Sequence, residues 1–215
     1  MFEDRQDAGR RLAVALLRYR RQDVVVAGLP RGGMPVALEI AKTLDAPMTM
    51  MFVRKIGVPA IPEVAMGAVV DGPHPYVFKN GDVIRQAGIS EAAFQSATDT
   101  ELTEIARRKS LFRSILPDIE IAGRIVILVD DGIATGATMK AAAMAVRQCG
   151  VERIVIAVPI APAGVIAALE DEVEEVVCLE AVSYLGAVGN FYSHFPQLSD
   201  DDVIGCFTGL ATAAR

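Results

Sequence analysis

Cysteine is scarce in this chain of 215 residues, which has only three: Cys149, Cys178 and Cys206. Their number is odd, they lie far apart, and none stands in a CxxC or Cys/His spacing. A structural zinc site and a disulfide framework need such spacings or an even set, so the sequence favours neither. We expect reduced thiols within a hydrophobic core, the usual arrangement in a cytoplasmic protein.

Basic residues are too few to dominate the surface. Lys and Arg number 21 against 27 Asp and Glu, which gives a formal charge of −6 and a pI near 5.0. General nucleic-acid binders and proteins of anionic membranes use a basic surface to attract phosphates, so this composition argues against both classes. We expect no nucleic-acid partner and no membrane, and any phosphate must be held by a local site.

Long apolar runs are missing as well. No uncharged apolar segment approaches the roughly 20 residues that cross a bilayer, and residues 1–21 are charged and amphipathic, unlike a secretory signal. The composition, 52% hydrophobic and 22% charged, is that of a folded globular chain. The length suits one core, so we expect a single cytoplasmic domain over residues 1–215.

Apolar periodicity predicts alternating strands and helices over most of the sequence. Strands that are apolar on both faces imply a mainly parallel sheet covered by helices on both sides, an α/β doubly wound fold. Such sheets bind ligands at the carboxyl ends of their strands. The expected strands are residues 23–29, 47–54, 124–129, 153–158 and 175–179, and the expected helices are residues 2–19, 34–44, 90–112, 137–149, 162–169 and 200–213.

Three segments depart from this alternation. Residues 55–63 hold one glycine and two prolines, which predicts a loop long enough to move. Residues 66–78 contain two short β-like pieces around Asp71-Gly72-Pro73, which predicts a hairpin. The core is expected over about residues 1–179, and residues 180–215 are expected to form a small cap that ends in a helix. Glu63 could reach a site if the loop of residues 55–63 closes over it, but a solvated carboxylate is the expected state. His74 is expected to lie on the surface.

One segment has the composition of a binding loop. Asp130-Asp131-Gly132-Ile133-Ala134-Thr135-Gly136-Ala137-Thr138 follows a predicted buried strand and opens a predicted helix. Its small residues let the backbone approach an anion, and the free amides of the first helical turn point toward it with the positive end of the helix dipole. Thr135 and Thr138 can add hydroxyl donors. The segment therefore predicts a phosphate site.

Two other phosphate-binding motifs do not fit this segment. A Walker loop needs a lysine before the hydroxyl residue, and none lies between Gly132 and Thr138. A dinucleotide-binding turn needs GxGxxG followed by an acid roughly 20 residues later, whereas Asp130 and Asp131 stand immediately before this turn. Two adjacent carboxylates repel each other unless a ligand or a cation uses them, which argues against a plain structural turn.

The run VILVDDGIATGATM at residues 126–139 resembles the signature with which type I phosphoribosyltransferases bind phosphoribosyl pyrophosphate (PRPP). The resemblance implies that family's fold, with a C-terminal cap (hood) and a β-hairpin/helix insertion, Mg²⁺ as the cofactor and a homodimer. It also implies that Asp130 and Asp131 are catalytic, holding the ribose hydroxyls and organising magnesium-bound waters. By the same resemblance, the residues that bind the 5'-phosphate are Ile133, Ala134, Thr135, Gly136, Ala137 and Thr138.

Two further segments extend the resemblance over roughly residues 24–179. Pro30-Arg31-Gly32-Gly33 is similar to the family's pyrophosphate-binding loop, in which glycines bare backbone amides and a basic side chain neutralises charge. Arg54 and Lys55, followed by the Gly/Pro segment, resemble the family's mobile loop, which closes over pyrophosphate and brings a basic residue with it. The resemblance thus implies that Arg31, Gly32 and Gly33 bind pyrophosphate and that Arg54 and Lys55 are catalytic.

The activity implied by the resemblance is the transfer of ribose 5-phosphate from PRPP to a nitrogenous acceptor, with release of pyrophosphate. Phe191, Tyr192 and Phe195 could form a platform for a base, with His194 as a polar contact, but such aromatics can equally form the core of the cap. Ala134 stands where the 6-oxopurine enzymes of the family carry an aspartate, which disfavours hypoxanthine and guanine. The identity of the acceptor stays open.

Two alternatives to a transferase also stay open. A PRPP- or nucleotide-sensing regulator can share this fold, and fold alone does not separate it from an enzyme. The presence of Arg31, Arg54 and Lys55 favours catalysis, because a sensor needs no lid over a leaving group. The more distant alternative is a hydrolase that uses the same phosphate loop with Asp130 as its nucleophile.

Overall fold

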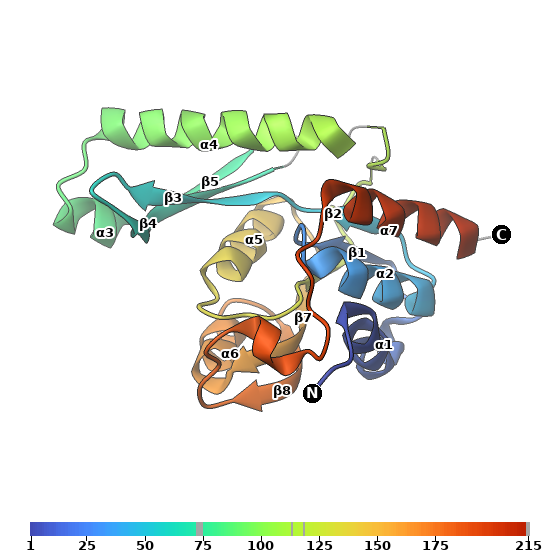
Figure 1. Cartoon of the computed structure of the whole chain (residues 1–215). Helices are drawn as coiled ribbons and strands as arrows, with labels where there is room; N and C mark the ends of the chain where they lie inside the picture. Colours follow the sequence, from blue (N-terminus) through green and yellow to red (C-terminus); the bar gives the residue numbers. More distant parts are fainter. Residues whose placement is uncertain (72–74, 113, 118, 214–215) are drawn as a thin grey trace.

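A computed structural model of the chain describes residues 1–71, 75–112, 114–117 and 119–213, without the side chains of residues 63 and 211–213. Two parts of the sequence predictions fall outside the described residues: the Gly72-Pro73-His74 part of the expected turn, and the Glu63 side chain. Figure 1 shows a larger layered body, with a smaller sheet and a long helix extending beside it.

A five-stranded parallel sheet forms the centre of the larger body (Figure 1). Its order is β2-β1-β6-β7-β8, so the chain adds β2 on one side of β1 and later returns to add β6 on the other. The carboxyl ends of β1 and β6 therefore flank the point where the strand order reverses, which is where such sheets bind ligands. The strands are β1 Val24–Gly28, β2 Met48–Met50, β6 Ile125–Val129, β7 Arg153–Pro162 and β8 Glu175–Val182.

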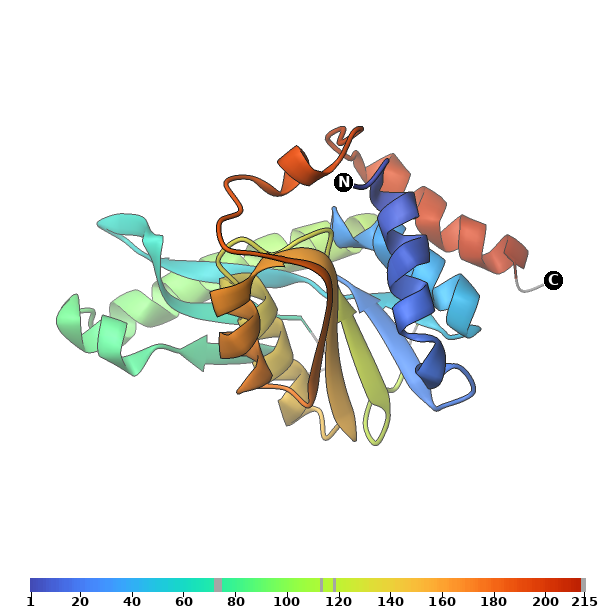
Figure 2. The same cartoon turned by 90° about the horizontal axis from the view of Figure 1, so that it is seen from below.

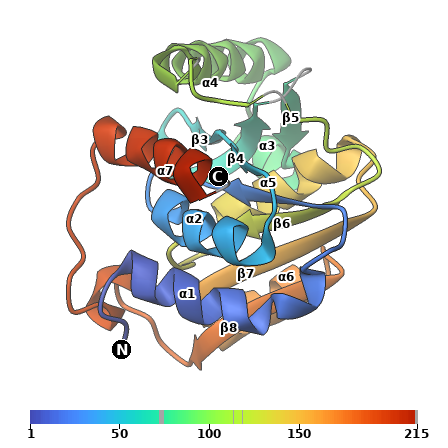
Figure 3. The ribbon, with the colours of Figure 1, turned by 90° about the vertical axis from the view of Figure 1, so that its right-hand side faces the viewer.

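Helices cover both faces of this sheet, which confirms the doubly wound α/β fold (Figures 2 and 3). Alternate side chains of the buried strands enter two hydrophobic clusters. Val24 and Ile127 belong to the cluster that includes α1, α2 and α7, whereas Val126 and Leu128 belong to the cluster that includes α5 and α6. The helical elements are α1 Arg5–Ala15, α2 Gly33–Leu44, α5 Ala137–Gln148, α6 Ala163–Glu170, α7 Asp200–Ala213, and the short 3₁₀ helices η1 Leu17–Tyr19 and η2 Val188–Phe191.

A smaller antiparallel sheet and two helices make up the segment between β2 and β6. Its strands, in the order β3-β4-β5, and its helices are β3 Val53–Val58, β4 Ile61–Val70, β5 Tyr76–Lys79, α3 Gly81–Gln86 and α4 Glu91–Phe112. β4 and β5 pair as the hairpin predicted for residues 66–78. The long helix α4 begins where expected, because the Ser90 hydroxyl accepts a hydrogen bond from the amide of Ala93 at 3.2 Å. The short helix α3 was not predicted.

Residues 55–63 do not form a loop, and that prediction is wrong. β3 and β4 continue through most of this segment as a hairpin with a two-residue connection. The pairing register shifts at Gly57, where a Cβ atom would lie 2.6 Å from the carbonyl oxygen of Pro62. Glycine permits this close approach, and the irregular pairing tolerates a proline, which has no N–H for the ladder. The single strand expected over residues 47–54 is likewise divided between β2 and β3.

Several element ends also differ from the sequence predictions. The first helix starts only at Arg5, because the Asp4 carboxylate caps it by accepting a hydrogen bond from the amide of Asp7 at 2.7 Å. β7 and β8 run beyond their predicted ends, to Pro162 and Val182. Within the described ranges, none of the helices combines the length and apolar character that a bilayer crossing requires.

The cysteines do not all lie in the core, as the sequence had suggested. Cys206 in α7 is buried, Cys178 in β8 is partly buried, and Cys149 is exposed because it follows the last residue of α5 at the edge of the molecule. Burial raises the pKa of the Cys206 thiol to about 11, so this thiol stays protonated at neutral pH.

Candidate functional site

The loops that follow β1 and β6 contact each other at the point where the strand order reverses. The amide of Leu29 donates to the carbonyl oxygen of Val129 at 2.8 Å, and the Pro30–Arg31 peptide bond is cis. A Cβ atom on Gly33 would lie 2.5 Å from that same oxygen, and one on Gly32 only 2.1 Å from Oδ2 of Asp131. A side chain at Gly33 would clash with the backbone of β6, and one at Gly32 would displace the Asp131 carboxylate. The predicted pyrophosphate loop and the predicted acids are therefore direct neighbours.

The two adjacent acids are held in a poorly solvated place. Oδ1 of Asp130 accepts a hydrogen bond from the backbone amide of Asp131 at 2.9 Å. Burial raises the pKa of Asp130 well above its usual range, and the neighbouring Asp131 carboxylate raises it further. Burial also raises the pKa of Asp131, while the guanidinium of Arg5 opposes that rise. Placing two carboxylates together here costs electrostatic free energy, as the sequence indicated.

Arg5 supplies a cation for this pair, and the sequence predictions did not include it. Its Nε donates to Oδ2 of Asp131 at 2.7 Å, and its Nη1 donates to the carbonyl oxygen of Pro196 at 2.9 Å. The guanidinium also lies over the Phe195 ring, 3.7 Å from its centroid. The sequence could have indicated its burial, because Arg5 stands three residues before Ala8 and therefore lies on the apolar side of α1.

The phosphate loop is anchored at its start and open further along. The amide of Ile133 donates to the carbonyl oxygen of Ile160 at 2.9 Å, and its side chain is buried, so this predicted phosphate ligand fixes the loop instead of offering its N–H. Gly136 has φ +77°, and a Cβ atom there would lie 2.7 Å from Val165 Cγ1. The other predicted ligands precede or begin α5, and no acceptor in the described chain takes their amides. They are Ala134, Thr135, Gly136, Ala137 and Thr138.

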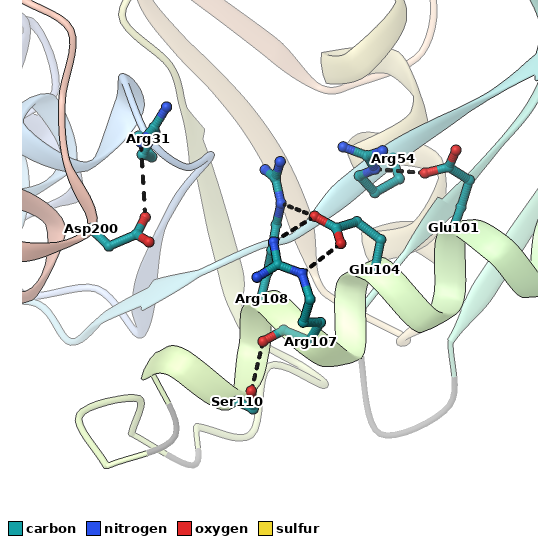
Figure 4. Close-up of polar contacts among 8 residues, drawn as sticks. All are labelled: Arg31, Arg54, Glu101, Glu104, Arg107, Arg108, Ser110 and Asp200. Carbon is teal, nitrogen blue, oxygen red and sulfur yellow. Dashed lines mark hydrogen bonds and ion pairs between the residues drawn. The ribbon is translucent and has the colours of Figure 1, made fainter.

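Arg54 and Lys55 point to opposite sides of β3, as consecutive strand residues must. Nε of Arg54 donates to Oε2 of Glu101 on α4 at 2.6 Å (Figure 4). Lys55 instead faces α5, where it helps to line a cavity of about 410 Å³ together with Ala137 and Thr138. The structure therefore brings Lys55, but not Arg54, beside the phosphate loop. The remaining residues that line this cavity are Val53, Ala65, Gly67, Ala68, Phe78, Asn80, Lys140 and Ala141.

Arg31 is an exposed basic residue of the predicted pyrophosphate loop. Its Nη1 lies 4.0 Å from Oδ1 of Asp200 at the start of α7, and 42% of its side chain is exposed (Figure 4). The ion pairs of helix α4 are separate from this one: Glu104 accepts hydrogen bonds from Arg107 and Arg108, and these hydrogen bonds lower the pKa of Glu104 to about 2. A weak, exposed ion pair leaves Arg31 able to turn toward an anion at low cost.

Comparison with known proteins bears directly on this arrangement of acids and loops. Residues 2–186 match the family model described as the phosphoribosyl transferase domain. The chain belongs to this family. A Mycobacterium tuberculosis protein named "putative phosphoribosyl transferase" is 46% identical over 204 residues, which are 95% of this chain and 46% of that protein. The chain thus spans about half the length of the curated relatives that it matches.

Two solved structures share the fold of this chain. The crystal structure of TT1426 from Thermus thermophilus superposes with a TM-score of 0.87, at 36% identity and 98% coverage of both chains. The structure of the AQ2163 protein from Aquifex aeolicus has a TM-score of 0.51 at 14% identity, covering 86% of this chain and 78% of that one. The second likeness shows the shared fold alone, and both agree with the expected fold class.

In this phosphoribosyl transferase domain, the cap segment is tied to the twin acids through Tyr192. Its hydroxyl donates to the backbone carbonyl oxygen of Asp131 at 2.6 Å, and burial raises its pKa. The ring packs between Phe2 and Phe195, with centroids 5.4 and 4.8 Å away, which leaves little open face on which a base could stack. Phe191 is half-buried whereas Tyr192 is buried, so Phe191 is the more accessible of these two residues proposed for the acceptor. His194, proposed as a polar contact, is exposed.

Asp130 and Asp131 could bind magnesium together with phosphate oxygens of a ligand and water molecules. Across the described residues, no group of three or more His, Cys, Asp or Glu side chains could hold a metal ion. Asp130 and Asp131 nevertheless provide carboxylate oxygens beside a loop of open amides, and Mg²⁺ is commonly bound through one or two carboxylates together with substrate phosphates and water. The residues therefore fit a magnesium ion that arrives with a phosphorylated ligand.

Proposed function

We propose that this domain transfers ribose 5-phosphate from PRPP to a nitrogenous acceptor and releases pyrophosphate. The observation that carries the proposal is the direct contact between Gly32 and Asp131, which joins the candidate pyrophosphate loop to the candidate ribose site. The open amides before α5 follow immediately on the same strand-to-helix connection. Three binding features thus occur in the order that pyrophosphate, ribose and 5'-phosphate have in PRPP.

Each part of PRPP has a proposed place. The 5'-phosphate lies at the open amides of residues 134–138, where the helix dipole favours negative charge. The ribose hydroxyls donate to the carboxylates of Asp130 and Asp131. The pyrophosphate lies beside the Gly32-Gly33 amides, with Arg31 turning from Asp200 toward it. Residues 180–215 act as the cap over this end of the core.

Charge on the departing pyrophosphate is the main electrostatic demand of the reaction. Bound with PRPP, Mg²⁺ supplies positive charge against the pyrophosphate. Lys55 adds positive charge to the bound PRPP from the face of β3 that lines the cavity beside Thr138. Arg54 contributes indirectly, because its ion pair with Glu101 fixes β3 against α4. Preorganised charges of this kind stabilise a transition state more than the ground state.

The class of acceptor is narrowed by one residue. Ala134 is exposed in the phosphate loop and carries no acid that could exchange a proton with a base. We therefore propose an acceptor other than a 6-oxopurine. We also propose that the protein is a homodimer, as the family resemblance implies.

The test is to incubate the protein with PRPP, Mg²⁺ and a panel of purines, pyrimidines and other nitrogenous acceptors, and to measure pyrophosphate release. Release that depends on one acceptor supports the transferase. Tight PRPP binding without release by any acceptor would replace it with the sensing regulator. Absence of PRPP binding would overturn both. Phosphate release from PRPP without any acceptor would indicate the hydrolase.

A further inference from the structure

Arg5 is an unusual residue for the interior of this protein. Only 8% of it is exposed, and among the described residues it shares the buried polar or charged class with Thr98 alone. A buried charge is costly unless it is paired and hydrogen-bonded. Arg5 meets that condition through the Asp131 carboxylate, the Pro196 carbonyl oxygen and the Phe195 ring. No buried side-chain nitrogen or oxygen of the described chain lacks a partner.

The Asp131 side chain is enclosed by these contacts. Arg5 holds its Oδ2 atom from one side at 2.7 Å, and the backbone of Gly32 approaches the same atom from another side. The Tyr192 hydroxyl fixes the Asp131 backbone at its carbonyl oxygen, 2.6 Å away. These contacts hold the carboxylate, and its ion pair with Arg5 uses a single oxygen, Oδ2.

The guanidinium is itself held from the cap. Its planar fork lets Nε serve Asp131 while Nη1 serves Pro196, and the flat face packs on Phe195. A lysine ammonium is a point charge on a flexible stem and cannot make this pair of fixed contacts with the same stacking. The segment from Tyr192 to Pro196 and the carboxylate of Asp131 are thus connected through one side chain.

We propose that Arg5 is a positioning residue, which orients the Asp131 carboxylate for the ribose of PRPP and makes that orientation depend on the packing of residues 192–196. The inference rests on the function proposed above. Arg5 acts through Asp131 and does not itself contact PRPP. Its loss weakens PRPP binding because Asp131 then samples several orientations, and ordering it again costs free energy on binding.

The first experiment measures PRPP affinity by calorimetry with Mg²⁺ for the unaltered protein and three variants. Arg5→Met keeps the length of the stem and should weaken binding about tenfold, and Arg5→Lys should fall between it and the unaltered protein. The matched control is Arg11→Met on the same helix, whose guanidinium pairs with Asp7 and lies over the Phe2 ring. It should change the affinity less than about twofold.

The second experiment separates positioning from a general effect on folding. Arg5→Met is introduced into Asp131→Asn, which has no carboxylate to orient, and should then change PRPP affinity less than about twofold. Equal losses in both backgrounds would show that Arg5 acts independently of Asp131 and would overturn the proposal. If Arg5→Met does not fold, Phe195→Leu, which removes the stacked ring, should weaken PRPP binding about threefold in the Asp131 background only.

The outcomes distinguish this inference from the proposed function. PRPP binding by the unaltered protein together with unchanged binding by the Arg5 variants overturns this inference alone. Tighter binding by Arg5→Met also overturns it, because Arg5 would then be a competing counterion. Failure of the unaltered protein to bind PRPP overturns both.

Discussion

Asp130 and Asp131 stand side by side where a buried strand meets a loop of open amides, and the Arg5 guanidinium faces them. The two carboxylates are stabilised by different groups. Asp131 has Arg5, whereas Asp130 is stabilised mainly by the amide of its neighbour. A ligand or a cation that reaches this place therefore has most to offer Asp130.

Asp131→Asn should lower PRPP affinity about tenfold or more, because a neutral amide replaces a charge that accepts hydrogen bonds from hydroxyls. The fold should survive, since Asn has nearly the same volume. Calorimetry with Mg²⁺ measures the affinity, and a thermal melt checks the fold. Asp201→Asn, an exposed aspartate at the start of α7, is the control and should change neither. Unfolding of Asp131→Asn would instead indicate a structural role.

Gly32→Ala should abolish most PRPP binding. The new methyl group would lie 2.1 Å from Oδ2 of Asp131, so the carboxylate must move, and overpacking of this kind costs about 1–3 kcal/mol of stability. Gly164→Ala is the matched control, because nothing lies within 4 Å of a Cβ atom there in α6, and it should stabilise the protein by up to about 1 kcal/mol. Undiminished PRPP binding by Gly32→Ala would show that PRPP binding does not depend on the close approach of Gly32 to Asp131.

At the scale of elements, strand β3 carries two basic residues with different surroundings. Arg54 pairs with Glu101 on α4, whereas Lys55 lines the cavity beside the phosphate loop. Consecutive side chains of a strand point to opposite faces. The sequence prediction placed Arg54 and Lys55 with one mobile loop and therefore could not separate them.

Lys55→Met should therefore weaken PRPP binding about tenfold with little change in stability, because it removes a cation from the ligand side of the strand. Arg54→Met should do the reverse, lowering stability by up to about 1 kcal/mol with a smaller effect on PRPP. Calorimetry and denaturant unfolding of both variants measure the two effects. A larger loss of PRPP affinity in Arg54→Met than in Lys55→Met would contradict this division.

Most elements could be predicted because their signals are local. The apolar run of residues 124–129 and the small residues before α5 indicate a buried strand and a helix start without knowledge of the rest of the chain. The hairpin at residues 55–63 could not be predicted this way, because Pro59 lies in the connection between the strands and Gly57 lies close to Pro62 of the facing strand, and both depend on how β3 and β4 pair. Arg5 was missed for a similar reason, since its partners are 126 and 191 residues away.

At the scale of the whole molecule, the twin acids should set part of the pH dependence of stability. The folded-state pKa of Asp130 is raised by burial and by Asp131, so the folded protein binds its proton more tightly than the unfolded chain does. Stability therefore falls as the pH rises from about 4 through the raised pKa.

Asp130→Asn should reduce this slope and raise the melting temperature at pH 7 by a few degrees, since about 1 kcal/mol corresponds to ~2–4 °C for a domain of this size. The same variant should bind PRPP more weakly. Thermal melts between pH 4 and 8 in metal-free buffer measure the effect. A melting temperature at pH 7 equal to or below that of the unaltered protein would show that the Asp130 carboxylate stabilises the fold.

Arg5 and the two residues to which it donates hydrogen bonds, Asp131 and Pro196, are synthesised at widely separated times. A ribosome adds residue 5 long before residue 131, and residue 196 later still. Asp131 can therefore emerge, and the parallel sheet around it can begin to pair, before the carbonyl oxygen of Pro196 exists to hold the guanidinium. If Arg5 positions Asp131 as proposed, the nascent sheet carries its two acids without the Arg5 contacts to the cap segment, and full PRPP affinity is reached only after Pro196 has been synthesised.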